Sequence, residues 1–132
     1  MNDLIALIKE LTEDSLYISR FIDVNIELLK DGDIDKMNKE TAKFYSFMNA
    51  SKARISKFEE LMDKNNLKSI REINNSEKYN TDELKKILKD FEITLKDSQN
   101  KISMYEKIMS ADLNMINKIK YFNKSGRVDF KI

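Results

Sequence analysis

Side chains that could carry catalysis or hold a metal are scarce in this sequence. Histidine and cysteine are both absent, which excludes Ser-His-Asp and Cys-His catalytic groups, zinc sites and the Glu-x-x-His pairs of di-iron bundles. Glycine occurs only twice, so a glycine-rich loop that cradles phosphate groups is also missing. We therefore expect no enzyme, and no catalytic, cofactor-binding or metal-binding residues.

One run of carboxylates imitates a metal-binding motif. Asp31, Asp33 and Asp35 have the spacing that opens a calcium loop. The residues that follow do not complete the loop, because Lys36 and Ala42 stand where glycine and a bidentate glutamate belong. We expect these aspartates to serve the ends of helices instead.

Composition indicates that long helices make up the chain. Charged residues account for 36% of the 132 residues, proline is absent and glycine is rare, so residues that interrupt helices are nearly missing. No run of about eighteen apolar residues is present, so we expect a cytoplasmic protein without membrane insertion. The net charge of +1 lacks the basic excess that phosphate binding requires, so we expect no nucleic-acid partner.

Apolar residues repeat with a helical period over two segments near the N-terminus. The first runs from about residue 3 to 31, with Asn2 as its cap, and the second from about 34 to 64. Gly32 is placed to end the first helix in the left-handed conformation, and Asp33 is placed to cap the second. Two long helices joined this tightly must pack as an antiparallel hairpin.

The apolar stripe along each of these two helices, which we call its seam, contains residue types that need an explanation. Ser15 and Asn25 interrupt the first seam, where they either fix the helix register at a cost in stability or take part in binding. The second seam is rich in Phe and Met, which is typical of a core and also of an adaptable binding surface. We expect Phe44, Phe58 and Phe91 in a shared core.

The longest seam lies between Asn80 and Phe122. Asn80 and Glu83 form a capping-box pattern, and Tyr79 can pack onto Leu84 as a hydrophobic staple. A helix over this whole segment would span about 60 Å, at about 1.5 Å per residue. The chain before it must supply the surface that covers the seam.

Two segments break the helical period. In residues 65–79, a short apolar pattern around Ile70 predicts a one- or two-turn helix capped by Asn66. Residues 128–132 alternate like a strand, but a lone strand is not stable, so we expect residues 123–132 to form a mobile C-terminal tail. The predicted fold is a single all-α domain over 1–132, an elongated antiparallel helical hairpin plus a long C-terminal helix in a three-helix bundle or coiled coil.

Three stretches carry a likeness to a known family. They are the helix junction Leu-Lys-Asp-Gly-Asp at 29–33, the segment Lys-Phe-Glu-Glu-Leu at 57–61 in a lysine-rich helix, and Tyr-Phe-Asn-Lys-Ser-Gly at 121–126. Together they resemble the flagellar export chaperones of the FlgN type, over most of the chain. The resemblance implies a cytoplasmic chaperone that binds the terminal helical segment of hook-filament junction proteins. Such a chaperone prevents premature assembly of these proteins and delivers them to the flagellar type III export gate.

The surface that binds the partner is expected in the C-terminal third. The first two helices span about 45 Å each and the third about 60 Å, so about two turns lack cover from within the chain. An exposed seam binds an amphipathic helix through anchors at helical spacing. The expected anchors are Tyr105, Met109, Leu113, Ile116, Ile119, Tyr121 and Phe122.

Self-association is the alternative, from a different class of function. A structural coiled coil or adaptor without an export client would cover the same seam with a second copy, as an obligate dimer. A chaperone would instead take up one helix of its partner and gain helicity on mixing. The sequence leaves both open.

Overall fold

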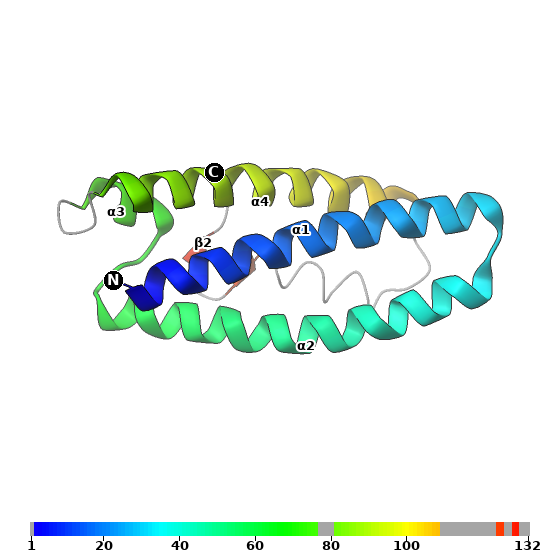
Figure 1. Cartoon of the computed structure of the whole chain (residues 1–132), viewed down its shortest axis with the longest axis horizontal. Helices are drawn as coiled ribbons and strands as arrows, with labels where there is room; N and C mark the ends of the chain where they lie inside the picture. The colour runs from blue at the N-terminus through cyan, green and yellow to red at the C-terminus, as the bar shows by residue number, and fades with distance from the viewer. Residues whose placement is uncertain (1, 77–80, 109–123, 126–127, 130–132) are drawn as a thin grey trace.

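Within the residues that the structure describes, three long helices and one short helix lie in an elongated bundle. The computed structural model describes residues 2–76, 81–108, 124–125 and 128–129. The helices are α1 (Asn2–Asp31), α2 (Ile34–Lys64), α3 (Ile70–Asn75) and α4 (Asp82–Ile108), and Figure 1 shows the long ones side by side. The all-α fold predicted from the sequence is confirmed.

A tight turn joins α1 to α2. Gly32 has a φ of 70°, in the left-handed region that favours glycine, and its amide donates to the carbonyl of Leu29 at 3.2 Å. The amide of Asp33 donates to the carbonyl of Leu28 at 3.1 Å, which completes a Schellman motif. The Asp33 carboxylate then accepts from the amide of Lys36 at 3.1 Å. Both predicted caps at this junction are confirmed.

A second Schellman motif ends α2. Asn66 has a φ of 58°, and its amide donates to the carbonyl of Asp63 at 3.0 Å. The amide of Leu67 donates to the carbonyl of Met62 at 2.8 Å, and both side chains are buried. Asn66 therefore ends α2, and the prediction that it caps the short helix α3 is wrong. The cap of α3 is Ser69.

The cap of helix α4 lies one residue after the cap predicted from the sequence. The hydroxyl of Thr81 accepts from the amide of Leu84 at 3.2 Å, so Thr81 is the cap. The predicted capping box of Asn80 with Glu83 is therefore wrong in register. Asn80 itself, and the segment 109–122 over which the helix was predicted to continue, lie outside the described residues.

α1 and α2 are antiparallel, as predicted. The hydroxyl of Ser51 in α2 donates to the carboxylate of Asp14 in α1 at 3.1 Å. Further along α1, Phe21 stacks on Phe44, an earlier residue of α2, with ring centroids 3.9 Å apart. In Figure 1, α2 accordingly returns along α1 toward the N-terminus.

α4 runs parallel to α1, a direction that the sequence left open. The hydroxyl of Ser19 donates to the carboxylate of Asp97 at 2.9 Å, and further along both helices Lys101 donates to Asp23 at 2.7 Å. The hydrogen bond to Asp23 raises the pKa of the Lys101 ammonium, against the opposing effect of its partial burial. The partners of both pairs lie 78 positions apart in the sequence, so α4 keeps one register against α1 between them.

Apolar residues at heptad positions form the core between these helices. Phe44, Phe58 and Phe91 are at most 1% exposed, which confirms their predicted place in the core. α1 packs mainly against α2 on one side and α4 on the other. The core seam of α4 consists of Leu84, Leu88, Phe91, Leu95, Ser98, Ile102 and Tyr105.

The polar residues that interrupt the α1 seam are buried in this core. Ser15 is 0% and Asn25 is 1% exposed. The Asn25 side-chain amide donates to the carbonyl of Phe21 in its own helix at 2.9 Å. Neither the Ser15 hydroxyl nor the Asn25 side-chain oxygen has a hydrogen-bond partner among the described residues. Neither residue therefore lies on a binding surface, and neither bonds to another described helix.

A short antiparallel β pair lies in the C-terminal segment. β1 (Lys124–Ser125) pairs with β2 (Val128–Asp129), so that Ser125 lies opposite Val128. The sequence predicted strand-like alternation without a partner here, and the structure corrects this, because the four residues pair with one another. The rest of the predicted tail lies outside the described residues.

The core assignment predicts a large effect of truncating one aromatic ring. Phe44→Ala should lower the free energy of unfolding by about 3–5 kcal/mol, because the fully buried ring leaves a cavity. Ile34→Ala is the matched control, since Ile34 is 68% exposed, and it should change the stability by at most about 0.5 kcal/mol. Urea denaturation followed by far-UV circular dichroism measures both. Equal effects would contradict the core assignment.

Candidate functional site

Of the residues predicted to bind a partner, only Tyr105 lies within the part of the chain that the structure describes. Tyr105 is 1% exposed and lies edge-on against Phe21, with ring centroids 6.4 Å apart. It belongs to the core, which corrects the expectation of an exposed anchor there. The other predicted anchors lie outside the described residues; they are Met109, Leu113, Ile116, Ile119, Tyr121 and Phe122.

A different surface combines exposed apolar side chains with charges. It follows two rows of residues spaced by seven, which share one side of a helix. All members of both rows are exposed. We name this surface the hairpin face, and it consists of Asp3, Glu10, Tyr17 and Val24 on α1 with Lys43, Ala50, Lys57 and Lys64 on α2.

The hairpin face lies on the side of α1 that points away from α4. Ser19 and Asp23 mark the side of α1 that contacts α4. At about 100° per residue, Asp3 and Glu10 lie roughly 140–180° around the helix from those two. Tyr17 stacks on an α2 side chain instead. The bundle therefore leaves this face uncovered by α4.

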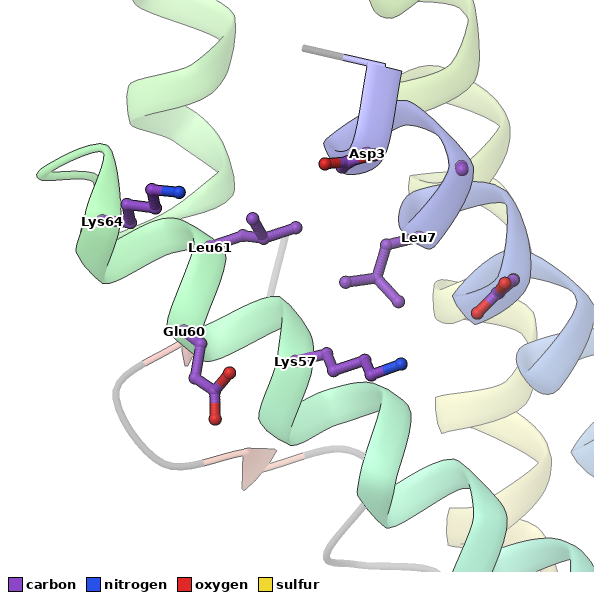
Figure 2. A pocket seen from close by; sticks show the side chains of 8 residues that line it. Asp3, Leu7, Lys57, Glu60, Leu61 and Lys64 are labelled. Atoms are coloured by element: carbon purple, nitrogen blue, oxygen red, sulfur yellow. The ribbon is translucent and has the colours of Figure 1, made fainter.

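One end of the hairpin face is hollowed, as Figure 2 shows. The hollow has a volume of about 440 Å³ and lies between the first turns of α1 and the last turns of α2. Leu7 and Leu61 point toward one another across it, which gives it an apolar floor. The lining residues are Asp3, Ala6, Leu7, Glu10, Lys57, Glu60, Leu61 and Lys64.

The charged side chains around this hollow are not paired with one another. Asp3 and Glu10 line the α1 side, and Lys57 and Lys64 line the α2 side. Glu60 also lines the α2 side, with its carboxylate directed away from the leucine floor in Figure 2. None of the five makes an ion pair or side-chain hydrogen bond within the part of the chain that the structure describes. They remain available to a ligand.

A buried carboxylate ties the two helices together beneath the middle of the face. Asp14 is 4% exposed and accepts two hydrogen bonds from Arg54, from Nε and Nη2, each at 2.7 Å. Ser51 donates a third hydrogen bond to the same carboxylate. The Arg54 guanidinium lies 5.9 Å from the centre of the Phe47 ring, which stacks on Tyr17 at 4.0 Å. This bidentate pair holds the aromatic stack in place at the surface.

The arrangement is suited to binding. An aromatic stack and Val24, beside unpaired charges, have the composition of a protein–protein contact. Within the described residues, no group of three or more His, Cys, Asp or Glu side chains could hold a metal ion. None of the described helices combines the length and the apolar character needed to cross a membrane.

No protein-family model, curated protein or solved structure matches this chain. The assignment of a function therefore depends on the chain's own surfaces.

Sequence reasoning missed the hairpin face, although a signal was present. Tyr17 and Val24 lie seven residues apart, off the core seam of the first helix, and they continue the spacing of Asp3 and Glu10. A second apolar row beside the core seam indicates a second contact surface on the same helix. The amphipathic pattern of the core dominated the interpretation and concealed this row.

The Asp14–Arg54 pair predicts a specific loss of stability. Arg54→Met leaves the buried Asp14 carboxylate without its two charge-assisted hydrogen bonds, so the free energy of unfolding should fall by about 2–3 kcal/mol. Arg20→Met is the matched control, because Arg20 is exposed and forms no ion pair with a described residue. Urea denaturation compares the two variants. Combining Arg54→Met with Asp14→Leu should restore most of the loss, and a failure to do so would count against an uncompensated charge as its cause.

Proposed function

We propose that this chain binds an amphipathic helix of a partner protein on the hairpin face and acts as a chaperone for that partner. The observation that carries this proposal is the row of Tyr17 and Val24, which are 37% and 43% exposed and lie on the same face as the hollow with its leucine floor. Exposed apolar groups in a row mark interaction sites, and a helix recognises such a row through anchors at helical spacing.

The dimensions of the face fit a helix. Residues spaced by seven advance about 10.5 Å along a helix, so an incoming helix with the same apolar spacing meets the row in register. The hollow, at about 440 Å³, accommodates a large apolar side chain as an anchor. The stack of Tyr17 on Phe47 offers a second, flat contact further along.

The likeness to the FlgN-type chaperones suggests the class of partner. On this proposal, the partner is a flagellar hook-filament junction protein whose terminal helical segment is held in the cytoplasm. Binding would prevent its premature assembly and deliver it to the flagellar export gate. The helical hairpin and its exposed apolar row support a helix-holding role, and the comparisons with known proteins add nothing to it.

A self-associating adaptor is the second candidate function, and a different surface favours it. Leu29 and Ile34 are 41% and 68% exposed, and both lie at the end of the bundle where α1 turns into α2. A symmetric dimer would cover them with a second copy. Sedimentation velocity combined with circular dichroism over a dilution series separates the two functions. An obligate dimer dissociates and loses helicity, whereas the chaperone stays monomeric and gains helicity when a client helix is added.

The proposal predicts that one charge introduced into the hairpin face weakens client binding. Val24→Asp should weaken the binding of a labelled terminal helical peptide from a hook-filament junction protein by at least about tenfold, because it places a carboxylate in the apolar contact. Fluorescence anisotropy measures the Kd, and far-UV circular dichroism checks the fold.

Ile93→Asp is the matched control for this experiment. Ile93 is 59% exposed on α4, outside the hairpin face, so its substitution should leave the Kd unchanged. Equal weakening by both variants would place the site elsewhere. A wild-type chain that does not bind the peptide would overturn the flagellar assignment.

A further inference from the structure

We infer that the opposed charges on the two sides of the hairpin face set the direction in which a bound helix lies. This inference rests on the proposed function, because it requires a helix on that face. Asp3 and Glu10 give the α1 side of the hollow a negative charge. Lys57 and Lys64 outnumber Glu60 on the α2 side, which is therefore positive.

These charges are free to act on a ligand. The hollow keeps the two sides apart, and none of the four side chains that set the polarity pairs with a described residue. Asp3 lies in the first turn of α1 and Lys64 in the last turn of α2. The helix dipole favours a negative charge at the first position and a positive charge at the second. The charges of Asp3 and Lys64 are therefore stabilised by their own helices without a partner across the hollow.

A helix on the hairpin face turns one flank toward α1 and the other toward α2. Reversing that helix end to end exchanges its flanks. A helix with basic residues on one flank and acidic residues on the other therefore meets opposite charges in one direction and like charges in the other. The apolar contacts alone do not distinguish the two directions. The partner chemistry that fits is an amphipathic helix with one basic and one acidic flank.

Two designed peptides test this inference on the full chain. Each is an amphipathic helix of about twenty residues with one apolar stripe, Lys on one flank and Glu on the other, and the second peptide has the two flanks exchanged. A nitroxide at the N-terminus of each peptide broadens the amide signals of the isotope-labelled chain that lie near it. We expect the first peptide to broaden signals at one end of the hairpin face and the second peptide at the other end. The preference for the matched direction should be on the order of tenfold.

Reversing the charges of the chain provides the complementary experiment. A variant with Asp3→Lys, Glu10→Lys, Lys57→Glu and Lys64→Glu keeps the net charge, and it should bind the first peptide in the reversed direction. Its far-UV circular dichroism spectrum should match that of the wild type.

A control variant places charge reversals away from the hairpin face. Lys86→Glu with Lys89→Glu changes two exposed residues of α4 and should leave the direction of both peptides unchanged. If both peptides bind the wild type in one direction, or each binds in both directions equally, the inference on direction is overturned while helix binding stands. If neither peptide binds, the proposed function itself is overturned.

Discussion

The two-residue turn at Gly32 and Asp33 is the constraint on which the rest of the structure depends. Because it is so short, it leaves α1 and α2 one alignment, in which the Asp14 carboxylate meets Arg54 and Ser51. The same alignment sets the seven-residue rows of the two helices opposite one another. The carboxylates of one row then lie across the hollow from the ammonium groups of the other. The hairpin face follows from the geometry of this turn.

The position of α4 has a different physical origin. The connection that leads into it, residues 65–81, is too long to dictate a direction. Polar side chains beside the core do so instead, through the contacts of Ser19 with Asp97 and of Asp23 with Lys101. Partly exposed pairs of this kind contribute little to stability, but they distinguish one register from the next where apolar seams repeat every seven residues. Because α4 occupies this side of α1, it does not cover the opposite side.

Signals local to the chain predicted the helices, whereas features that join distant segments escaped prediction. The role of Gly32 at the end of α1 could be predicted because a left-handed cap depends on only a few neighbouring residues. The caps of α3 and α4 were predicted at Asn66 and Asn80 because asparagine is favoured at the start of a helix. Serine and threonine are favoured there too, and Ser69 and Thr81 are the caps in the structure. Tyr105 was misassigned because a seam position has the same spacing whether α1 covers it or solvent does. The hairpin face forms only when the row on α1 lies beside the row on α2. The sequence of either row alone does not show how the two are aligned.

The parallel packing of α1 with α4 has a consequence for the order in which the chain folds. Contacts near the α1–α2 turn close a short loop, whereas the contact of Ser19 with Asp97 joins residues 78 positions apart. Longer loops cost more entropy to close, and a chain is synthesised from its N-terminus. We therefore expect α1 and α2 to pair before α4 docks. During synthesis, both sides of α1 are then open to contact until α4 emerges from the ribosome and closes one of them.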